Sequence, residues 1–314
     1  MSYDTDTGFG FGGKAFALNQ FSANESVDLT LFGSSKGERW LRFVFSLPDF
    51  ERRQGKIYPL ALDLSIDYDK WLQYNFFGIG LDSRFTDRII YEREVTDISF
   101  TLSKGFTSRI VAQAGLRYKR ITNSGLAGMV PLSLGLSNSF LPDQAEFLSV
   151  PASLRYDSRD SFINPSTGLV ALGEVEPGVR LDSANTSSFA RYGLTLQYYM
   201  VVWYPRTVMA ARISYQSLNH KRLPFQGLLS VGGSSTVRWA MQERYLVRSY
   251  WLTNWELRFP LIGRLGGLVG FDAVDTMINP VVGLRFYMDT FVVRADMGFG
   301  TESTGFYLNF GHMF

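Results

Sequence analysis

Apolar and polar residues alternate along almost the whole chain, and this two-residue period constrains the fold more than any other feature. One example is residues 60–68, whose apolar face carries Leu60, Leu62, Leu64, Ile66 and Tyr68. The same pattern recurs in 110–119, 194–200 and 293–299. Because successive side chains of a β-strand point to opposite sides, the pattern predicts strands with one apolar and one polar face. Helical periodicity is hard to find, so we expect an all-β protein.

A soluble β-sandwich also alternates, so two further features are needed to favour a membrane barrel. The predicted strands have about 10 residues or more, the length that a tilted strand needs to cross a bilayer. Aromatic residues collect near strand ends, as in interfacial girdles: Tyr68, Tyr118, Tyr204, Tyr287 and Phe291. No apolar run approaches the ~20 residues of a membrane helix. Because only a closed barrel satisfies every backbone group in lipid, we predict a transmembrane antiparallel β-barrel.

The predicted strands lie near residues 7–18, 25–34, 38–50, 57–69, 90–105, 107–121, 146–157, 167–182, 187–203, 206–218, 249–260, 264–275, 280–289, 290–300 and 304–314. A short strand at about 1–5 would raise the number from 15 to 16, and bacterial barrels normally have an even number. With both termini periplasmic, the long connections 69–89, 121–146 and 218–248 are predicted to be outer loops. No linker or composition shift marks a boundary, so we expect one barrel domain over residues 1–314.

Composition excludes several classes of function. A net charge of +2 is too small to indicate a nucleic-acid partner, and the absence of cysteine removes disulfides, thiol catalysis and cysteine metal sites. The chain has only two histidines, His220 and His312, and no G-x-S-x-G motif, so no catalytic triad can be assembled. We therefore expect no enzyme activity, no cofactor and no metal, which a hydrolase assay on purified protein would test.

Three charged residues form the candidate site. Alternation places Glu256 on the same face as Asn254 and Arg258, and it places Asp272 on the polar face of the next strand. Both carboxylates are then expected to face the barrel lumen, and the loop 218–248 is long enough to fold back toward them with Arg238. A guanidinium can bind one carboxylate with two hydrogen bonds and reach a second, which would pin the loop. The alternative is that all three are solvated lumen charges without fixed partners.

Two further segments have diagnostic value. The predicted periplasmic turn YDSRDSFINPSTG, residues 156–168, is interpreted as a charged turn whose Asp and Arg pair locally. The chain ends FYLNFGHMF, in which Phe306, Leu308, Phe310, His312 and Phe314 alternate. A final phenylalanine such as Phe314 is typical of outer-membrane barrels, where it serves recognition by the assembly machinery.

Several segments together resemble the BamA and surface-antigen superfamily of outer-membrane assembly, insertion and secretion barrels. YDTDTGFGFGG resembles the first hairpin of that family, YDSRDSFINPSTG its Asp-x-Arg-Asp turn, and LPFQGLLSVGGSSTVRWA its sixth-loop motif. NWELRFP, VGFDAVDT and YLNFGHMF resemble the strands that follow. The resemblance implies a lumenal sixth extracellular loop, in which Val237 and Arg238 belong to the motif and Arg238 binds Glu256 and Asp272.

The chain also departs from that family. Trp239 and Ala240 replace the usual Gly and aromatic residue after Arg238, so the loop tip must pack differently. The polypeptide-transport-associated (POTRA) domains that usually precede such a barrel are not found in residues 1–314. The expectation is therefore a barrel cut from a longer chain or a short family member that works alone or with separate periplasmic partners.

The resemblance implies a barrel in the outer membrane of a Gram-negative bacterium that takes part in protein insertion into that membrane or translocation across it. Its expected partners are outer-membrane lipid and lipopolysaccharide, client outer-membrane or secreted proteins, and no nucleic acid. A passive or regulated pore for small solutes or lipids is the alternative, because a polar lumen fits it equally well. Planar-bilayer conductance would distinguish the two functions.

Overall fold

The computed structural model describes residues 2–5, 7–130, 140–182, 187–202, 204, 206–220, 223–289 and 291–314. Its strands are β1 (Ser2–Asp4), β2 (Gly8–Leu18), β3 (Ser26–Ser34), β4 (Arg39–Leu47), β5 (Tyr58–Phe76), β6 (Ile89–Gly105), β7 (Ile110–Ser124), β8 (Gln144–Ser149), β9 (Ala152–Asp157), β10 (Gly168–Arg180), β11 (Ser188–Val201), β12 (Val208–His220), β13 (Leu229–Val231), β14 (Tyr245–Val247), β15 (Ser249–Ile262), β16 (Leu265–Val274), β17 (Met277–Tyr287), β18 (Val292–Phe299) and β19 (Thr304–Phe310). The helical elements are short: α1 (Phe50–Arg53), α2 (Leu126–Met129) and the 3-10 turns Phe85–Asp87 and Phe225–Gly227. Across the described ranges, no helix has the length and apolar character needed to span a membrane.

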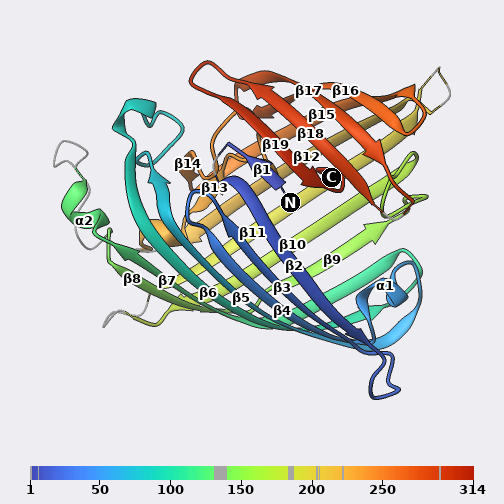
Figure 1. Ribbon diagram of the computed structural model, residues 1–314. Helices are drawn as coiled ribbons and strands as arrows, with labels where there is room; N and C mark the ends of the chain where they lie inside the picture. The colour runs from blue at the N-terminus through green and yellow to red at the C-terminus, as the bar shows by residue number, and fades with distance from the viewer. Residues whose placement is uncertain are drawn as a thin grey trace.

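The main sheet closes on itself into a barrel (Figure 1). Each neighbouring pair of strands is antiparallel, and β1 pairs with β2 on one side and β19 on the other. The described residues form 17 strands of this sheet, and β8 and β9 both lie between β7 and β10. Counting β8 and β9 as one position gives 16 positions around the ring. We call the β1–β19 pairing, with Tyr3 opposite Leu308, the seam.

The all-β barrel prediction is confirmed, including the short strand at the start of the chain, but some boundaries differ. β5 continues to Phe76, beyond the predicted end at residue 69. The predicted strand 146–157 divides before Pro151, which has no backbone N–H to continue the ladder. The last strand ends at Phe310 instead of residue 314, because Gly311 has a φ of +77° that turns the chain. Residues after Gly311 therefore do not continue the alternating face.

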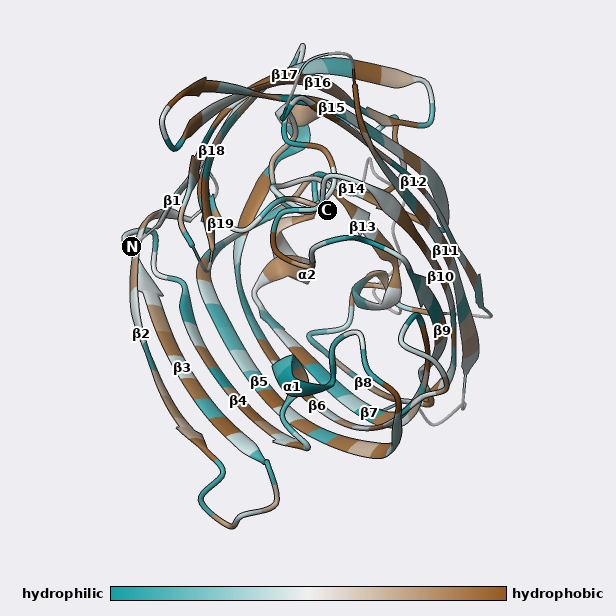
Figure 2. Ribbon diagram, turned by 90° about the vertical axis from the view of Figure 1, so that its right-hand side faces the viewer, coloured by the Kyte–Doolittle hydropathy of each residue, from teal (hydrophilic) through white to brown (hydrophobic). Residues whose placement is uncertain are grey.

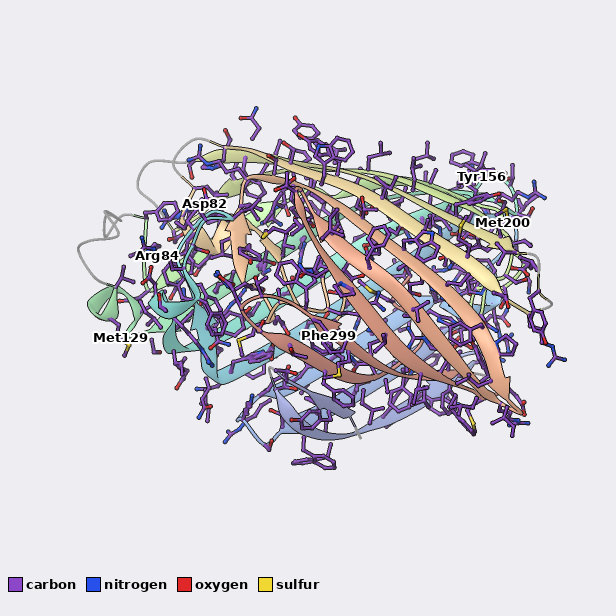
Figure 3. All side chains as sticks on the ribbon, turned by 90° about the horizontal axis from the view of Figure 1, so that it is seen from above. Asp82, Arg84, Met129, Tyr156, Met200 and Phe299 are labelled. Atoms are coloured by element: carbon purple, nitrogen blue, oxygen red, sulfur yellow. The ribbon has the colours of Figure 1, made fainter. Side chains whose placement is uncertain are left out.

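The two faces of the wall follow the sequence alternation (Figures 2 and 3). Apolar side chains such as Leu194 and Leu284 point outward and are about half exposed, and Met200 and Phe299 are also exposed. Inward-facing neighbours such as Arg285 are polar or charged, and many are fully buried. Apolar atoms therefore face lipid, while the lumen carries the charges.

The height of the wall varies around the barrel. β5 and β6 have 19 and 17 residues, whereas β18 and β19 have 8 and 7. A membrane-crossing strand normally needs about 9–11 residues. The wall is therefore low on both sides of the seam, at β1 with 3 residues and at the hairpin β18–β19.

The connection between β12 and β15 enters the barrel instead of extending outward. We call its residues 223–248 the inner loop, and Figure 2 shows its strands β13 and β14 inside the ring. Apolar residues of the inner loop form a buried cluster with the wall: Val231, Val237, Trp239, Ala240, Tyr245, Val247, Leu252 and Val274. The inner loop thus occupies part of the barrel lumen.

Candidate functional site

The tip of the inner loop is a closed turn beyond the hairpin β13–β14. Gly232 has a φ of +130°, and a Cβ there would lie 2.0 Å from the carbonyl oxygen of Met241, so the tip requires glycine at this position. The backbone N–H of Gly232 donates to the hydroxyl of Thr236 at 2.8 Å. These contacts shape the turn that carries Arg238.

Arg238 is fully buried against three carboxylates of the barrel wall. Its Nε and Nη2 donate to the two oxygens of Asp272 at 2.9 and 2.8 Å, a bidentate contact, and its backbone N–H donates to Asp272 at 2.8 Å. Its Nη1 donates to Glu256 at 2.6 Å and to Asp296 at 3.2 Å. One loop residue thus joins strands β15, β16 and β18.

The structure brings together the predicted residues Arg238, Glu256 and Asp272, and it places Val237 in the buried apolar cluster beside them. Asp296 was missed, although alternation in 293–299 had already placed it on the polar face. Alternation shows that Asp296 lies on the lumen face of its strand. It does not show that this strand, β18, lies within reach of the loop tip.

Three more arginines surround these carboxylates. Arg258 binds Glu256 at 2.8 Å, Arg285 is hydrogen-bonded to Asp296, and Arg294 lies 3.3 Å from Asp296. Burial alone would lower the pKa of Arg238, but Asp272 and Glu256 hold that pKa well above its usual value. Arg238 therefore stays charged, and its loss would remove the ion-pair partner of the buried Asp272.

A second ion pair tethers the inner loop to the opposite wall. Arg93 of β6 donates to Glu243 at 2.8 Å and lies 4.5 Å from the ring centre of Tyr74. Burial by itself would raise the pKa of Glu243, but the charge of Arg93 overrides it and lowers that pKa. Sequence reasoning missed this pair because its members are 150 residues apart.

Arg244 links the tip to two outer loops. Its guanidinium donates to Glu302 at 3.0 and 3.1 Å and to Ser83 at 2.6 and 2.8 Å. The same guanidinium lies 4.6 Å from the ring centre of Phe77 and 4.5 Å from that of Tyr245. Together the arginine and glutamate anchors hold the tip from several sides of the lumen.

The unusual pair after Arg238 packs inward. Trp239 is almost fully buried, and its ring centre lies 6.1 Å from that of Tyr245. Ala240 is buried beside it in the same cluster. The indole of Trp239 thus fills space between the inner loop and the wall at a position where the family usually has glycine.

The turn that follows β9, which we predicted to be periplasmic, contains the local pairing expected from its sequence. Arg159 donates to both carboxylate oxygens of Asp157 at 3.0 and 2.8 Å. Gly168 has a φ of +117°, and a Cβ there would lie 2.6 Å from the carbonyl oxygen of Ser158. This turn is therefore a structural element at the rim and does not contribute to the loop anchor.

Phe314 packs inside the barrel. It is almost fully buried, clusters with Tyr199, and lies with its ring centre 5.0 Å from the guanidinium of Arg212 and 5.4 Å from that of Arg258. Since β19 ends at Phe310, Phe314 does not lie on the last strand as the alternation suggested. Its function as an assembly signal stays a prediction.

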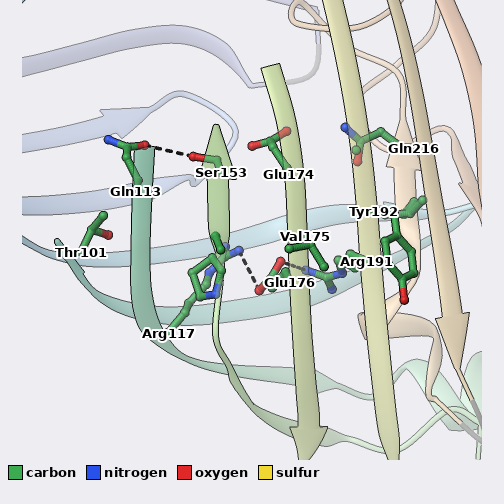
Figure 4. Close-up of a pocket in the computed structure, with 14 residues that line it drawn as sticks. Thr101, Gln113, Arg117, Ser153, Glu174, Val175, Glu176, Arg191, Tyr192 and Gln216 are labelled. Carbon is green, nitrogen blue, oxygen red and sulfur yellow. Dashed lines mark hydrogen bonds and ion pairs between the residues drawn. The ribbon is translucent and has the colours of Figure 1, made fainter. Parts of the chain in front are cut away.

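Cavities remain between the inner loop and the wall. The one in Figure 4 has a volume of about 380 Å³ and is lined by polar side chains of β7, β9, β10, β11 and β12. There Glu176 lies 3.2 Å from Arg191 and 3.5 Å from Arg117. A second cavity of about 250 Å³ shares Arg191 with the first. The lumen is thus polar and incompletely filled.

Comparison with known proteins agrees with this architecture. The Omp85 superfamily domain matches residues 19–274. The structure is similar to BamA from Haemophilus ducreyi lacking POTRA domains 1–3 (TM-score 0.70, 13% identity, 99% of this chain and 68% of that one). It is also similar to CdiB from Escherichia coli (0.66, 12%, 98% and 61%) and CdiB from Acinetobacter baumannii (0.59, 12%, 99% and 58%). No curated protein matched the chain.

The family match covers most of the chain, so this protein belongs to the Omp85 superfamily. It is a BamA-like β-barrel of the Gram-negative outer membrane. The chain spans 58% and 61% of the length of the two CdiB structures.

Proposed function

We propose that this barrel inserts polypeptides into the outer membrane or translocates them across it. The observation that carries the proposal is the low wall beside the seam. β19 has 7 residues, which extend about 23 Å at ~3.3 Å per residue. A tilt of about 40° reduces this to about 18 Å, against a hydrocarbon core of ~30 Å.

Lipid beside β18 and β19 must thin to match this short apolar band. A thinner hydrocarbon layer lowers the cost of moving the polar backbone of an unpaired client strand into the membrane. If β1 and β19 separate, their free edges offer backbone donors and acceptors to which such a strand can pair. In this mechanism the inner loop, held by Arg238, Glu256 and Asp272, maintains the shape of the closed barrel. Neither a cofactor nor a catalytic step is required.

The test is a disulfide across the seam. The chain contains no cysteine, so Tyr3→Cys/Leu308→Cys places a single cysteine pair at directly opposed positions. Opposed Cα atoms in an antiparallel ladder are about 4.5–5.5 Å apart, within disulfide range. Liposomes containing the oxidised variant are expected to insert an unfolded small barrel client severalfold more slowly than after reduction.

The matched control is Ala295→Cys/Leu308→Cys, which joins β18 to β19 away from the seam. It contains the same cysteine at position 308, and its oxidation is expected to leave insertion unchanged. Equal insertion by the oxidised and reduced seam variants would contradict the proposal.

The partners proposed here follow from the same mechanism. Unfolded outer-membrane or secreted polypeptides are the clients, and outer-membrane lipid and lipopolysaccharide contact the outward apolar face. Delivery of the client is assigned to separate periplasmic proteins or to domains outside residues 1–314.

A regulated pore is a second candidate, favoured by the polar cavities in the lumen. The cavities of about 380 and 250 Å³ share Arg191 and Leu229, and a third of about 230 Å³ shares Arg93 with the second. In planar bilayers, a large steady conductance with the inner loop in place would favour the pore. Low conductance that rises only after loop release would favour the insertion proposal.

A further inference from the structure

The hairpin β18–β19 contains a notch that the tip of the inner loop fills. Gly298 and Gly305 are directly opposed across the two strands and face the lumen. A Cβ at Gly298 would lie 2.5 Å from the carbonyl carbon of Arg238 and 2.6 Å from the backbone nitrogen of Trp239. A Cβ at Gly305 would lie 2.2 Å from the carbonyl oxygen of Arg238. The loop backbone therefore occupies the space where two side chains would otherwise project.

Three side chains of the same hairpin bind residues 238–240 of the tip. Ser303 donates to the carbonyl oxygen of Trp239 at 2.9 Å, and the Tyr307 hydroxyl donates to that of Ala240 at 3.1 Å. Asp296 accepts from Arg238 at 3.2 Å. We call Asp296, Gly298, Ser303, Gly305 and Tyr307 the loop seat.

The loop seat and the seam share one strand. Tyr307 directs its ring to the inner loop, while its backbone is opposite Asp4 of β1. On either side of Tyr307, Leu308 is opposite Tyr3, and Phe306 exchanges hydrogen bonds with Thr5 at 2.8 and 3.1 Å. A displacement of β19 at the loop seat therefore moves the residues that close the barrel.

We propose that occupation of the loop seat holds β19 against β1, so that the inner loop regulates opening of the seam. The seated tip stabilises the short hairpin through contacts on its lumen side. A longer hairpin would be stabilised instead by more backbone hydrogen bonds to its neighbouring strands. When the tip leaves, the hairpin loses its contacts with Trp239 and Ala240 and the ion pair with Arg238. The hairpin is then free to move away from β1. This inference deepens the proposed function by naming what controls the seam, but its measurement requires no client.

Spin labels on Tyr3→Cys/Leu308→Cys report the seam directly, because both sites lie on the outward face of the wall. With the loop seat occupied, the two labels are close and their dipolar broadening is strong. Gly305→Ala, whose Cβ would overlap the loop backbone, is expected to remove most of that broadening. Tyr307→Phe, which deletes one hydrogen bond and adds no atom, is expected to reduce it partly.

Gly173→Ala is the matched control, since a Cβ at this strand glycine meets no atom within 4 Å. It is expected to leave the broadening at the level of the parent pair. A shift between unheated and boiled protein on gels identifies variants that form a barrel, and Tyr307→Phe carries the test if Gly305→Ala does not fold.

Unchanged broadening in folded Gly305→Ala and Tyr307→Phe would overturn the coupling between the loop seat and the seam. Such a result would leave the insertion proposal intact, because that proposal depends on the disulfide experiment. The opposite outcome is reduced broadening in these variants together with equal insertion rates for the oxidised and reduced seam disulfide. It would support the coupling and contradict the proposed function.

Discussion

Arg238 is the residue on which the interior of this barrel depends most directly. It is buried with three carboxylates: its Nε and Nη2 donate to Asp272, and its Nη1 donates to both Glu256 and Asp296. Buried ion pairs contribute little compared with apolar packing, but removing one partner is costly because the other charge stays buried. No other side chain can therefore make the same set of contacts with these three carboxylates.

Arg238→Lys keeps the charge but loses the bidentate hydrogen bonds to Asp272, so it is expected to destabilise the barrel by about 1.5–3 kcal/mol. The heat-induced shift in gel mobility, followed against temperature, measures this loss. Arg264→Lys is the control, because the pair of Arg264 with Asp289 is exposed and such pairs contribute about 0–1 kcal/mol. Equal midpoints for the two variants would contradict the importance of the buried anchor.

Glu243 supplies a residue-scale prediction about pH. Its pKa is lowered mainly because Arg93 outweighs the opposing effect of burial. A carboxylate with a lowered native pKa contributes its stabilisation above its unfolded pKa and loses it as pH falls through the native value. Loss of this ion pair would release the inner loop, so conductance in planar bilayers is expected to stay low at neutral pH and to rise only in acid, below the ordinary pKa of a glutamate.

Glu243→Gln is expected to raise conductance already at neutral pH, because the amide cannot neutralise Arg93. Gln216→Glu, at a lumen position away from the loop anchors, controls for a general effect of lumen charge. A pH-induced rise of the same size in Glu243→Gln would show that another group governs it.

At the scale of elements, the segment after β19 ends in Phe314, and a terminal aromatic residue can have two functions. It can pack inside the barrel, or it can be the signal that the assembly machinery recognises. Phe314 packs with Tyr199, Val170 and Ala210 inside the barrel instead of continuing the strand. As a packing residue it requires volume, whereas as an assembly signal it requires an aromatic ring. Substitutions can therefore distinguish the two.

Phe314→Ala is expected to cost the refolded barrel about 3 kcal/mol through the cavity it leaves. Phe314→Leu keeps most of the volume and is expected to cost less than about 1.5 kcal/mol. If the ring is also the assembly signal, Phe314→Leu will still lower the amount of barrel in the outer membrane. Normal membrane levels of a stable Phe314→Leu protein would assign Phe314 to packing alone.

For the whole molecule, the decisive property is the unequal height of the wall. β5, with 19 residues, lies in the tall part of the wall, and β19, with 7, forms the low edge beside the seam. The membrane must adapt to both, and mismatch costs fractions of a kcal/mol per Å. In the proposed mechanism, this asymmetry directs thinning to the side where a client enters.

Bilayer thickness is therefore expected to change the barrel's contribution to insertion. In liposomes of long-chain phosphatidylcholine, the ratio of insertion rates with and without the protein is expected to rise severalfold above the ratio in short-chain liposomes. The reason is that spontaneous insertion already proceeds in thin bilayers, whereas thick bilayers need the local thinning at β19. A ratio independent of chain length would exclude thinning as part of the mechanism.

The sequence by itself determined the barrel wall. Alternation is a local property, so it identified the strands, their outward apolar face and the lumen side of Glu256 and Asp272 without knowledge of neighbours. Alternation gave 15 strands, and the short strand at the start of the chain was expected because bacterial barrels normally have an even number. The resemblance to a known family then connected Arg238 to those two carboxylates.

Only the tertiary structure decided which distant residues meet inside that wall. Asp296 at the Arg238 anchor, the Arg93–Glu243 tether and the glycine notch of the loop seat join segments far apart in the chain. The position of Phe314 inside the lumen likewise depends on a turn at Gly311 and on side chains of other strands. A two-residue period specifies the side of the wall on which a residue lies, but the curvature of the closed sheet and the path of the loop specify its partner.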